Sequence, residues 1–290
     1  MKKRRSRNRL RNMLLRYCLL LPVFSPVLPA IASDQIEHVQ LVHPVYDFLM
    51  RAAARGAAGD ISMVVLPLQR AEVIKALRRI RTQEALLNSV DREMLLHFEK
   101  EFGIQTTQNA VVFSSASDST QIFFNHLLSD DQKYIYHYED SLNAVRVVPL
   151  AALEYRVRSD DSTNSVALGQ AGLRLHGTIN NFIGYYLQVT NGAVLGGNRS
   201  VALADPVLHR NIKFSELNSD FDFTESHVRI DYGPVFAIIG RETRTIGSGY
   251  FNNTFVSNTA APFDAVTVGA RFEHFAYRFM HGTIGRASCR

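Results

Sequence analysis

The histidine, serine and glycine residues of this chain are its first candidates for chemistry, and none of them stands in a catalytic spacing. Its ten histidines show neither the H-x-x-x-H nor the H-E-x-x-H spacing of a helical zinc site. We expect His274 and His281, at the end of a predicted strand, to face an interior or an interface rather than a metal. The glycine-rich stretch 192–197 lacks the Gly-Lys-Ser/Thr of a phosphate-binding loop, so we interpret its glycines as turn residues. Residues 114–117 contain three serines without the strand–turn–helix elbow of a nucleophile, so the sequence predicts no enzyme, no cofactor and no metal site.

The first 32 residues have the composition of a secretory signal peptide. They contain eight Lys or Arg and no Asp or Glu, then an apolar stretch over 19–28 and the cleavage site Ala30-Ile31-Ala32. The alternative is a membrane anchor, but three prolines interrupt the stretch, which is shorter than the ~20 residues of a spanning helix. Without this leader, 24 basic residues face 27 acidic ones, a net charge of −3. We therefore expect an exported, mildly acidic protein, and the overall pI of about 9.3 does not indicate a nucleic-acid partner.

The two cysteines give the mature chain no thiol chemistry. Cys18 lies in the leader, and Cys289 lies in 284–290 (IGRASCR), which resembles the translation of a sequencing adapter. We expect that heptapeptide to be a non-native tail and the chain to be an N-terminal fragment of a longer protein. Because no other cysteine is present, a disulfide scaffold and a cysteine-ligated metal are excluded.

Residues 34–103 carry the apolar spacing of three short helices. The stripe that begins at Val45 ends at Gly56, Pro67 is expected to open a second helix, and Ser89 is expected to cap a third that stops at Gly103. We expect the basic residues of the second helix to form a solvated face: Arg70, Lys75, Arg78 and Arg79. The residues expected to hold the bundle together are Val45, Leu49, Val73, Leu77, Met94 and Phe98.

Beyond residue 110 the helical spacing gives way to alternation. Of the 29 aromatic residues, 23 follow Val111. Within 183–190 the odd positions are apolar and the even ones are small or polar, and the same period recurs in the other segments. One apolar face and one polar face are typical of an antiparallel sheet. The predicted strands are 147–158, 166–177, 182–190, 222–232, 235–244 and 264–276.

Connection lengths favour a membrane barrel over a soluble sandwich. Short turns follow the even-numbered strands, at 178–181 and 233–234, whereas the longer connections 159–165, 191–221 and 245–263 follow the odd-numbered ones. Outer-membrane barrels with a periplasmic N-terminus show this asymmetry. No apolar run of 18 residues follows the leader, which excludes helical membrane spans. The sequence thus predicts a mainly β fold, in which a small α-helical plug precedes a partial, truncated antiparallel transmembrane β-barrel.

The segment after the fifth predicted strand is the most distinctive of the chain. It reads GRETRTIGSG over 240–249, with Ser257-Asn258 and Ala261-Pro262-Phe263 after it. Together with the helical segments 43–49 and 67–70, it resembles the capsule assembly Wzi family of outer-membrane barrels over residues 40–282. These barrels have a strand that ends in Gly-Arg, then Trp-Gly-x-Gly, Ser-Asn-Ala and Pro-Phe.

The resemblance implies a barrel in the bacterial outer membrane whose periplasmic mouth is closed by a helical plug. It also implies a lectin-like, non-enzymatic role, with capsular or other surface polysaccharide and outer-membrane lipid as partners. Ile246 stands where the family usually has Trp, so stacking of a sugar on an aromatic ring is in doubt at that position. Charged groups of such a surface would hydrogen-bond sugar hydroxyls and uronate carboxylates. The candidate ligand-binding residues are Arg229, Asp231, Arg241, Glu242, Arg244, Arg271 and Glu273.

A general channel for small solutes is the rival hypothesis. A plugging bundle argues against free conduction, and an outer-membrane hydrolase lacks a convincing Ser/His pair. The expected organisation is a signal peptide (1–32), a helical bundle (33–107), a connecting segment (108–145), barrel strands (146–283) and the tail (284–290).

Overall fold

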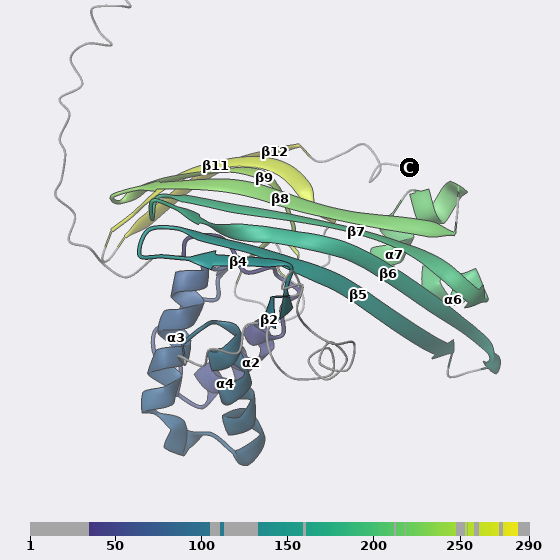
Figure 1. Ribbon diagram of the computed structural model, residues 1–290, viewed down its shortest axis with the longest axis horizontal. Coiled ribbons are helices and arrows are strands. Elements are labelled where there is room, and N and C mark those ends of the chain that lie inside the picture. The colour runs from purple at the N-terminus through teal and green to yellow at the C-terminus, as the bar shows by residue number, and fades with distance from the viewer. Residues whose placement is uncertain are drawn as a thin grey trace, which may run out of the picture. The chain divides into compact units, whose positions relative to one another are not determined.

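The computed structural model describes residues 35–104, 111–112, 133–158, 161–211, 213–217, 219–247, 253, 255–257, 261–272 and 275–283. The predicted signal peptide, the serines of 114–117, the candidate Glu273, His274 and the tail 284–290 lie outside these residues. The fold is mainly β: a large antiparallel sheet follows a group of short helices (Figure 1).

Three helices share one hydrophobic core. They are α2 (Val45–Ala54), α3 (Arg70–Thr82) and α4 (Ser89–Glu101), with a short 3-10 turn η1 (Glu84–Leu86) before α4. The predicted helices are confirmed, because five of the six residues expected to hold them together lie in the core and Met94 packs against it. Within the described residues, no helix is long and apolar enough to cross a membrane.

Two helix starts differ from the prediction. Helix α3 begins at Arg70, not at Pro67, because Gln69 and Glu72 form a capping box in which the Gln69 amide donates to the Glu72 carboxylate at 3.0 Å. Helix α4 is capped by Asn88, whose side chain accepts from the Asp91 amide at 2.7 Å, so Ser89 is its first residue. Arg70 is buried and not part of a solvated face, since its guanidinium bonds Gln35 at 2.6 Å.

Eight antiparallel strands form the main sheet in the order β12-β11-β9-β8-β7-β6-β5-β4. Their bounds are β4 (Tyr136–Glu139), β5 (Ala144–Arg158), β6 (Asp161–Ile179), β7 (Ile183–Gly197), β8 (Asp220–Tyr232), β9 (Val235–Glu242), β11 (Phe263–Arg271) and β12 (Ala276–Thr283). Two small sheets pair β1 (Val65–Leu66) with β10 (Thr245–Ile246) and β2 (Val111–Val112) with β3 (Lys133–Tyr134). Between the described residues of β4 and β12 there is no pairing, so the sheet is open there and closure into a barrel stays a prediction.

The connections confirm part of the predicted length pattern. Asn180 and Asn181, with φ of 51° and 56°, form a tight turn after β6, and Gly233, with φ of 58°, begins the one after β8. The predicted loop 159–165 is too long, because β6 begins at residue 161 and Asp161 and Ser165 pair with β5. The stretch 192–197 is likewise strand, where Gly192 admits the ring of Phe221. The last predicted strand, 264–276, is too long: β11 ends at Arg271, and a further strand, β12, begins at Ala276.

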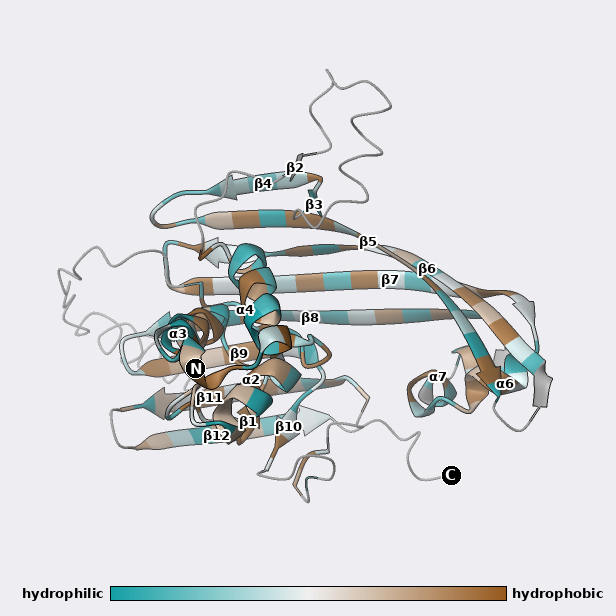
Figure 2. Cartoon of the chain, turned by 90° about the horizontal axis from the view of Figure 1, so that it is seen from below, coloured by the Kyte–Doolittle hydropathy of each residue, from teal (hydrophilic) through white to brown (hydrophobic). Residues whose placement is uncertain are grey.

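Hydrophobic and hydrophilic residues alternate along the strands (Figure 2), and their burial shows that the two faces of the sheet differ in polarity. Apolar side chains on the outer face are exposed, among them Leu153 at 82%, Tyr155 at 70% and Ile239 at 61%. Polar side chains on the inner face, such as Arg146 and Thr178, are buried. The helices lie on this inner, concave side (Figure 1). The polarity is thus inverted relative to a soluble sheet, whose apolar face is the buried one.

A second core lies at the other end of the long strands. The connection between β7 and β8 forms α6 (Arg199–Leu203), α7 (Pro206–Arg210) and the π-helical turn η2 (Lys213–Leu217). Its apolar side chains pack on the inner face of β6 and β8, in a cluster that includes Leu208, Phe214 and Phe221. The inner face is therefore bordered by the helices α2–α4 at one end of the strands and by the connection between β7 and β8 at the other.

Candidate functional site

The N-terminal segment, residues 35–40, brings the helices onto the inner face of the sheet. His38 and Gln69 form an antiparallel bridge, and the Val39 amide donates to the Leu68 carbonyl at 2.9 Å. Gly184 of β7 allows close approach, since a Cβ there would lie 2.7 Å from the Glu37 nitrogen. The segment is thus bound to the start of α3 on one side and to the sheet on the other.

Glu37 anchors this segment through a buried polar cluster. Its carboxylate accepts a hydrogen bond from the Thr178 hydroxyl at 2.8 Å and lies 3.4 Å from His176 Nδ1 and 3.5 Å from Arg146 Nη1. Burial raises the pKa of the Glu37 carboxyl, but the hydrogen bond from His176 and the charges of Arg70 and Arg146 outweigh it and bring the pKa to about 2. Glu37 therefore carries its charge at neutral pH and ties the segment to β5 and β6.

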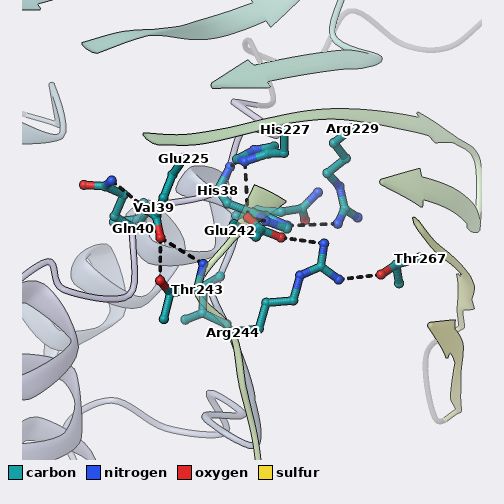
Figure 3. A network of polar contacts seen from close by, with 12 residues as sticks. His38, Val39, Gln40, Glu225, His227, Arg229, Glu242, Thr243, Arg244 and Thr267 are labelled. Atoms are coloured by element: carbon teal, nitrogen blue, oxygen red, sulfur yellow. Dashed lines mark hydrogen bonds and ion pairs between the residues drawn. The ribbon is translucent and has the colours of Figure 1, made fainter. Parts of the chain in front are cut away.

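His38 anchors the segment through a second network, drawn in Figure 3. The Nδ1 atoms of His38 and His227 lie 3.0 and 3.2 Å from the same oxygen of Glu242, and its other oxygen lies 2.8 Å from Arg244 Nη2. The His38 backbone amide donates to His227 Nε2 at 3.2 Å, and Arg229 Nη1 lies 3.3 Å from His38 Nε2. Because each Nε2 faces a donor, both rings carry their proton on Nδ1 and donate it to Glu242.

These tautomers argue against a metal ion. His38, His227 and Glu242 are the group of potential metal ligands that lie together among the described residues. A metal bound at both Nδ1 atoms would move each proton to Nε2, where it would meet the His38 amide or Arg229, both of which are donors. The adjacent guanidinium groups of Arg229 and Arg244 would also repel a cation. The arrangement suits a hydrogen-bonded network that fixes the N-terminal segment.

The burial of His38 has an electrostatic consequence. Burial, assisted by the charges of His227 and Arg229, lowers the pKa of the His38 imidazole to about 4 against the pull of Glu242. His38 is therefore neutral at pH 7, as its tautomer requires.

Most of the predicted ligand-binding residues take part in these contacts between helices and sheet. Arg229 lies 2.7 Å from Asp231 through Nε, and Asp231 accepts a hydrogen bond from Gln69 at 2.8 Å. Arg244 donates to Thr267, and Glu242 belongs to the network just described. Arg271 forms an ion pair with Glu72 of α3, and Arg241 lies 3.5 Å from Asp264. Of the six described candidates, Arg241 alone borders open space; Glu273 lies outside the described residues.

That open space is a groove of about 960 Å³ on the inner face, between the N-terminal segment and the α6–α7 connection. Its volume lies at the upper end of the range of about 300–1,000 Å³ that is typical of ligand sites. Small residues open it, because Gly172 and Thr190 face each other across β6 and β7. The polar side chains that line it include Gln40, Glu154, Arg156, Gln170, Arg174, Gln188, Thr190, Asp205, Asn211, Lys213, Glu225, Arg241 and Thr243.

One end of the groove is an ordered set of polar groups. Arg174 donates to Gln188 Oε1 at 2.9 Å and to Gln40 Oε1 at 3.2 Å. The Gln40 amide in turn donates to Glu225 Oε2 at 2.8 Å, and the Thr243 backbone amide donates to the other oxygen at 2.9 Å (Figure 3). These bonds fix the donors and acceptors that border the groove.

The other end is apolar and aromatic. Leu168, Leu208, Phe221 and Phe223 line it, and Phe223 keeps part of its surface exposed. Hydroxyl-rich rings with apolar C–H faces, such as sugars, fit a site that combines aromatic rings with fixed amide and guanidinium groups.

Sequence reasoning placed charged residues at the site but missed most of the groove. Gln170 and Arg174 belong to the polar face of the predicted strand 166–177, and Gln188 and Thr190 to that of 182–190. The same alternation of polar and apolar residues that predicted the sheet therefore also places these four residues on its polar face. Comparisons of the chain with protein-family models, with curated proteins and with solved structures find no match.

Proposed function

We propose that this chain belongs to a bacterial outer-membrane β-barrel protein of the capsule assembly Wzi type, which binds surface polysaccharide and catalyses no reaction. An N-terminal signal peptide would export it, and the helices would close the periplasmic mouth. The observation that carries the proposal is the inverted polarity of the sheet, whose apolar side is exposed and whose polar side encloses the groove.

Membrane insertion follows from the outer face. Apolar side chains such as Leu153 of β5, Leu187 of β7 and Val268 of β11 are exposed on this face. Lipid contact would stabilise this face by roughly 25 cal/mol for each Å² of apolar surface removed from water. Strands β5 to β8 span 13 to 19 residues, more than the ~9–11 that a tilted crossing needs.

Polysaccharide binding is supported by the chemistry of the groove. Fixed amides and guanidinium groups at one end and phenylalanine rings at the other match the hydroxyl groups and C–H faces of sugars. The polar inner face also suits a solute channel, which is the second candidate. The helices and the N-terminal segment at the turn end of the strands favour binding over free passage.

Filling the groove tests the proposal. In the full-length protein, Gln170→Trp places a large ring in the groove, and Leu173→Trp, on the outer face of the same strand, is the matched control. We expect cells that carry the first variant to release surface polysaccharide into the medium, as cells without the protein do, and cells that carry the second to retain it. Retention by all of these cells, with high conductance of the intact protein in planar bilayers, would favour the channel and overturn the binding role.

A further inference from the structure

Arg174 stands out among the basic residues of the groove because it meets no carboxylate. Within the described part of the chain, its hydrogen-bond partners are the side chains of Gln188, Gln40 and Tyr186, all of them neutral. The Gln40 amide stands between this guanidinium and the nearby acid, since it accepts from Arg174 and donates to Glu225. The positive charge of Arg174 is therefore held at the groove without neutralisation by contact.

The other basic side chains of the groove are neutralised in place. Arg156 lies 2.6 Å from Glu154 and 2.9 Å from Asp205. Lys213 lies 3.2 Å from Asp220, and Arg241 lies 3.5 Å from Asp264. An anionic ligand would compete with these carboxylates anywhere except at Arg174.

The position of Arg174 also suits a ligand. Its side chain is half-buried, and two acceptors hold two of its nitrogens, Nε and Nη2, in place. Its guanidinium also contacts the hydroxyl of Tyr186, so every polar group that it meets among the described residues is neutral and its charge remains available to an anion. A guanidinium whose side chain is already ordered loses little entropy when it binds, and charge-assisted hydrogen bonds are stronger than neutral ones.

We propose that the groove selects an acidic glycan, and that Arg174 binds the carboxylate of a uronic acid residue in it. This inference rests on the proposed function and narrows it from polysaccharide in general to carboxylate-bearing polysaccharide. A neutral hydroxyl at this position would lose the ion pair with Arg174 and the two-oxygen geometry that a carboxylate offers a guanidinium.

A matched pair of probes tests the inference by calorimetry on the full-length protein in detergent micelles. The probes are an oligosaccharide of galacturonic acid and the same oligosaccharide after reduction of its carboxylates to alcohols. We expect the acidic probe to bind about 10- to 100-fold more tightly, the range that a hydrogen bond to a charged group is worth. Arg174→Gln should remove that preference, Arg174→Lys should keep part of it, and Arg78→Gln, at an exposed position of α3 outside the groove, should leave it unchanged.

The outcomes separate this inference from the proposed function. Equal binding of both probes to the unaltered protein would overturn selection of an acid and leave the binding role standing. Binding of neither probe would count against both. A preference that survives Arg174→Gln would refute the assignment to Arg174. Should that variant not fold, an undiminished preference in Arg174→Lys, which lacks the guanidinium, would refute it equally.

Discussion

The carboxylate of Glu242 is expected to decide whether the N-terminal segment stays on the sheet. It is buried, at 4% exposure, and it accepts from His38 and His227 while it pairs with Arg244. Glu242→Gln keeps the shape but removes the charge, and the new NH₂ group would face side chains that are all donors. Arg244, also 4% exposed, would keep a buried charge without its carboxylate.

The size of the effect follows from that uncompensated charge. Removal of one partner of a buried ion pair costs about 3–5 kcal/mol. Glu225→Gln is the matched control, because Glu225 accepts from the neutral groups of Gln40 and Thr243 and no cation pairs with it among the described residues. Loss of such neutral-donor bonds costs about 1 kcal/mol each. With both bonds to Glu225 lost, the difference is about 1–3 kcal/mol, so the N-terminal segment should open about 5- to 150-fold more often in Glu242→Gln.

Hydrogen exchange of peptides that cover residues 35–40 measures this opening in the full-length protein. We expect fast exchange in Glu242→Gln and slow exchange in Glu225→Gln. The double change Glu242→Gln with Arg244→Gln should exchange more slowly than Glu242→Gln, since it removes both charges together. Equal exchange in the two single variants, or no recovery in the double one, would refute the role assigned to the Glu242 charge.

Three further predictions concern pH, the helices and export. The pKa of His38 lies at about 4 in the folded protein against an ordinary value of 6.5. The contribution of His38 to stability is therefore complete above pH 6.5 and falls by up to about 3 kcal/mol as the pH drops to 4. Denaturant titrations at several pH values should show this slope, and His38→Gln should flatten it. Deletion of residues 35–103 from the full-length protein should raise its conductance in planar bilayers, and unchanged conductance would contradict closure by the helices. N-terminal sequencing of the exported protein should find a start near Ser33, whereas an intact Met1 would contradict the signal peptide.

Local patterns predicted the elements and the faces of this fold well. The helical stripes at Val45 and Val73 and the alternation over 183–190 recur in the structure, because periodicity follows directly from which face is buried. The prediction failed where tertiary pairing overrides composition. Residues 161–165 are polar enough to resemble a loop, yet they belong to β6, where Asp161 and Ser165 pair with β5. The start of α3 was missed because its capping box uses Gln69 in place of serine or threonine.

The contacts of the site could not be predicted from spacing. His38 and His227 meet although 189 residues separate them, and nothing local to either one indicates the other. Alternation places Arg229 and Glu242 on the polar face of the sheet, but it does not show whether a polar face binds a ligand or packs against another part of the chain. At Arg229 and Glu242 the polar face packs against the chain itself. The groove lies further along the strands, at Gln170 and Arg174, where small neighbouring residues leave room.

Lipid contact at the outer face is the central claim, and the absence of tryptophan from this chain makes it directly measurable. With any tryptophan outside these 290 residues replaced by phenylalanine, the full-length protein with Leu173→Trp or Gln170→Trp carries a single tryptophan on the outer or the inner face of β6. In lipid vesicles, we predict that brominated acyl chains quench the first and leave the second bright, while aqueous acrylamide does the reverse. Quenching of the Leu173→Trp variant by acrylamide, with no effect of brominated lipid, would contradict the account.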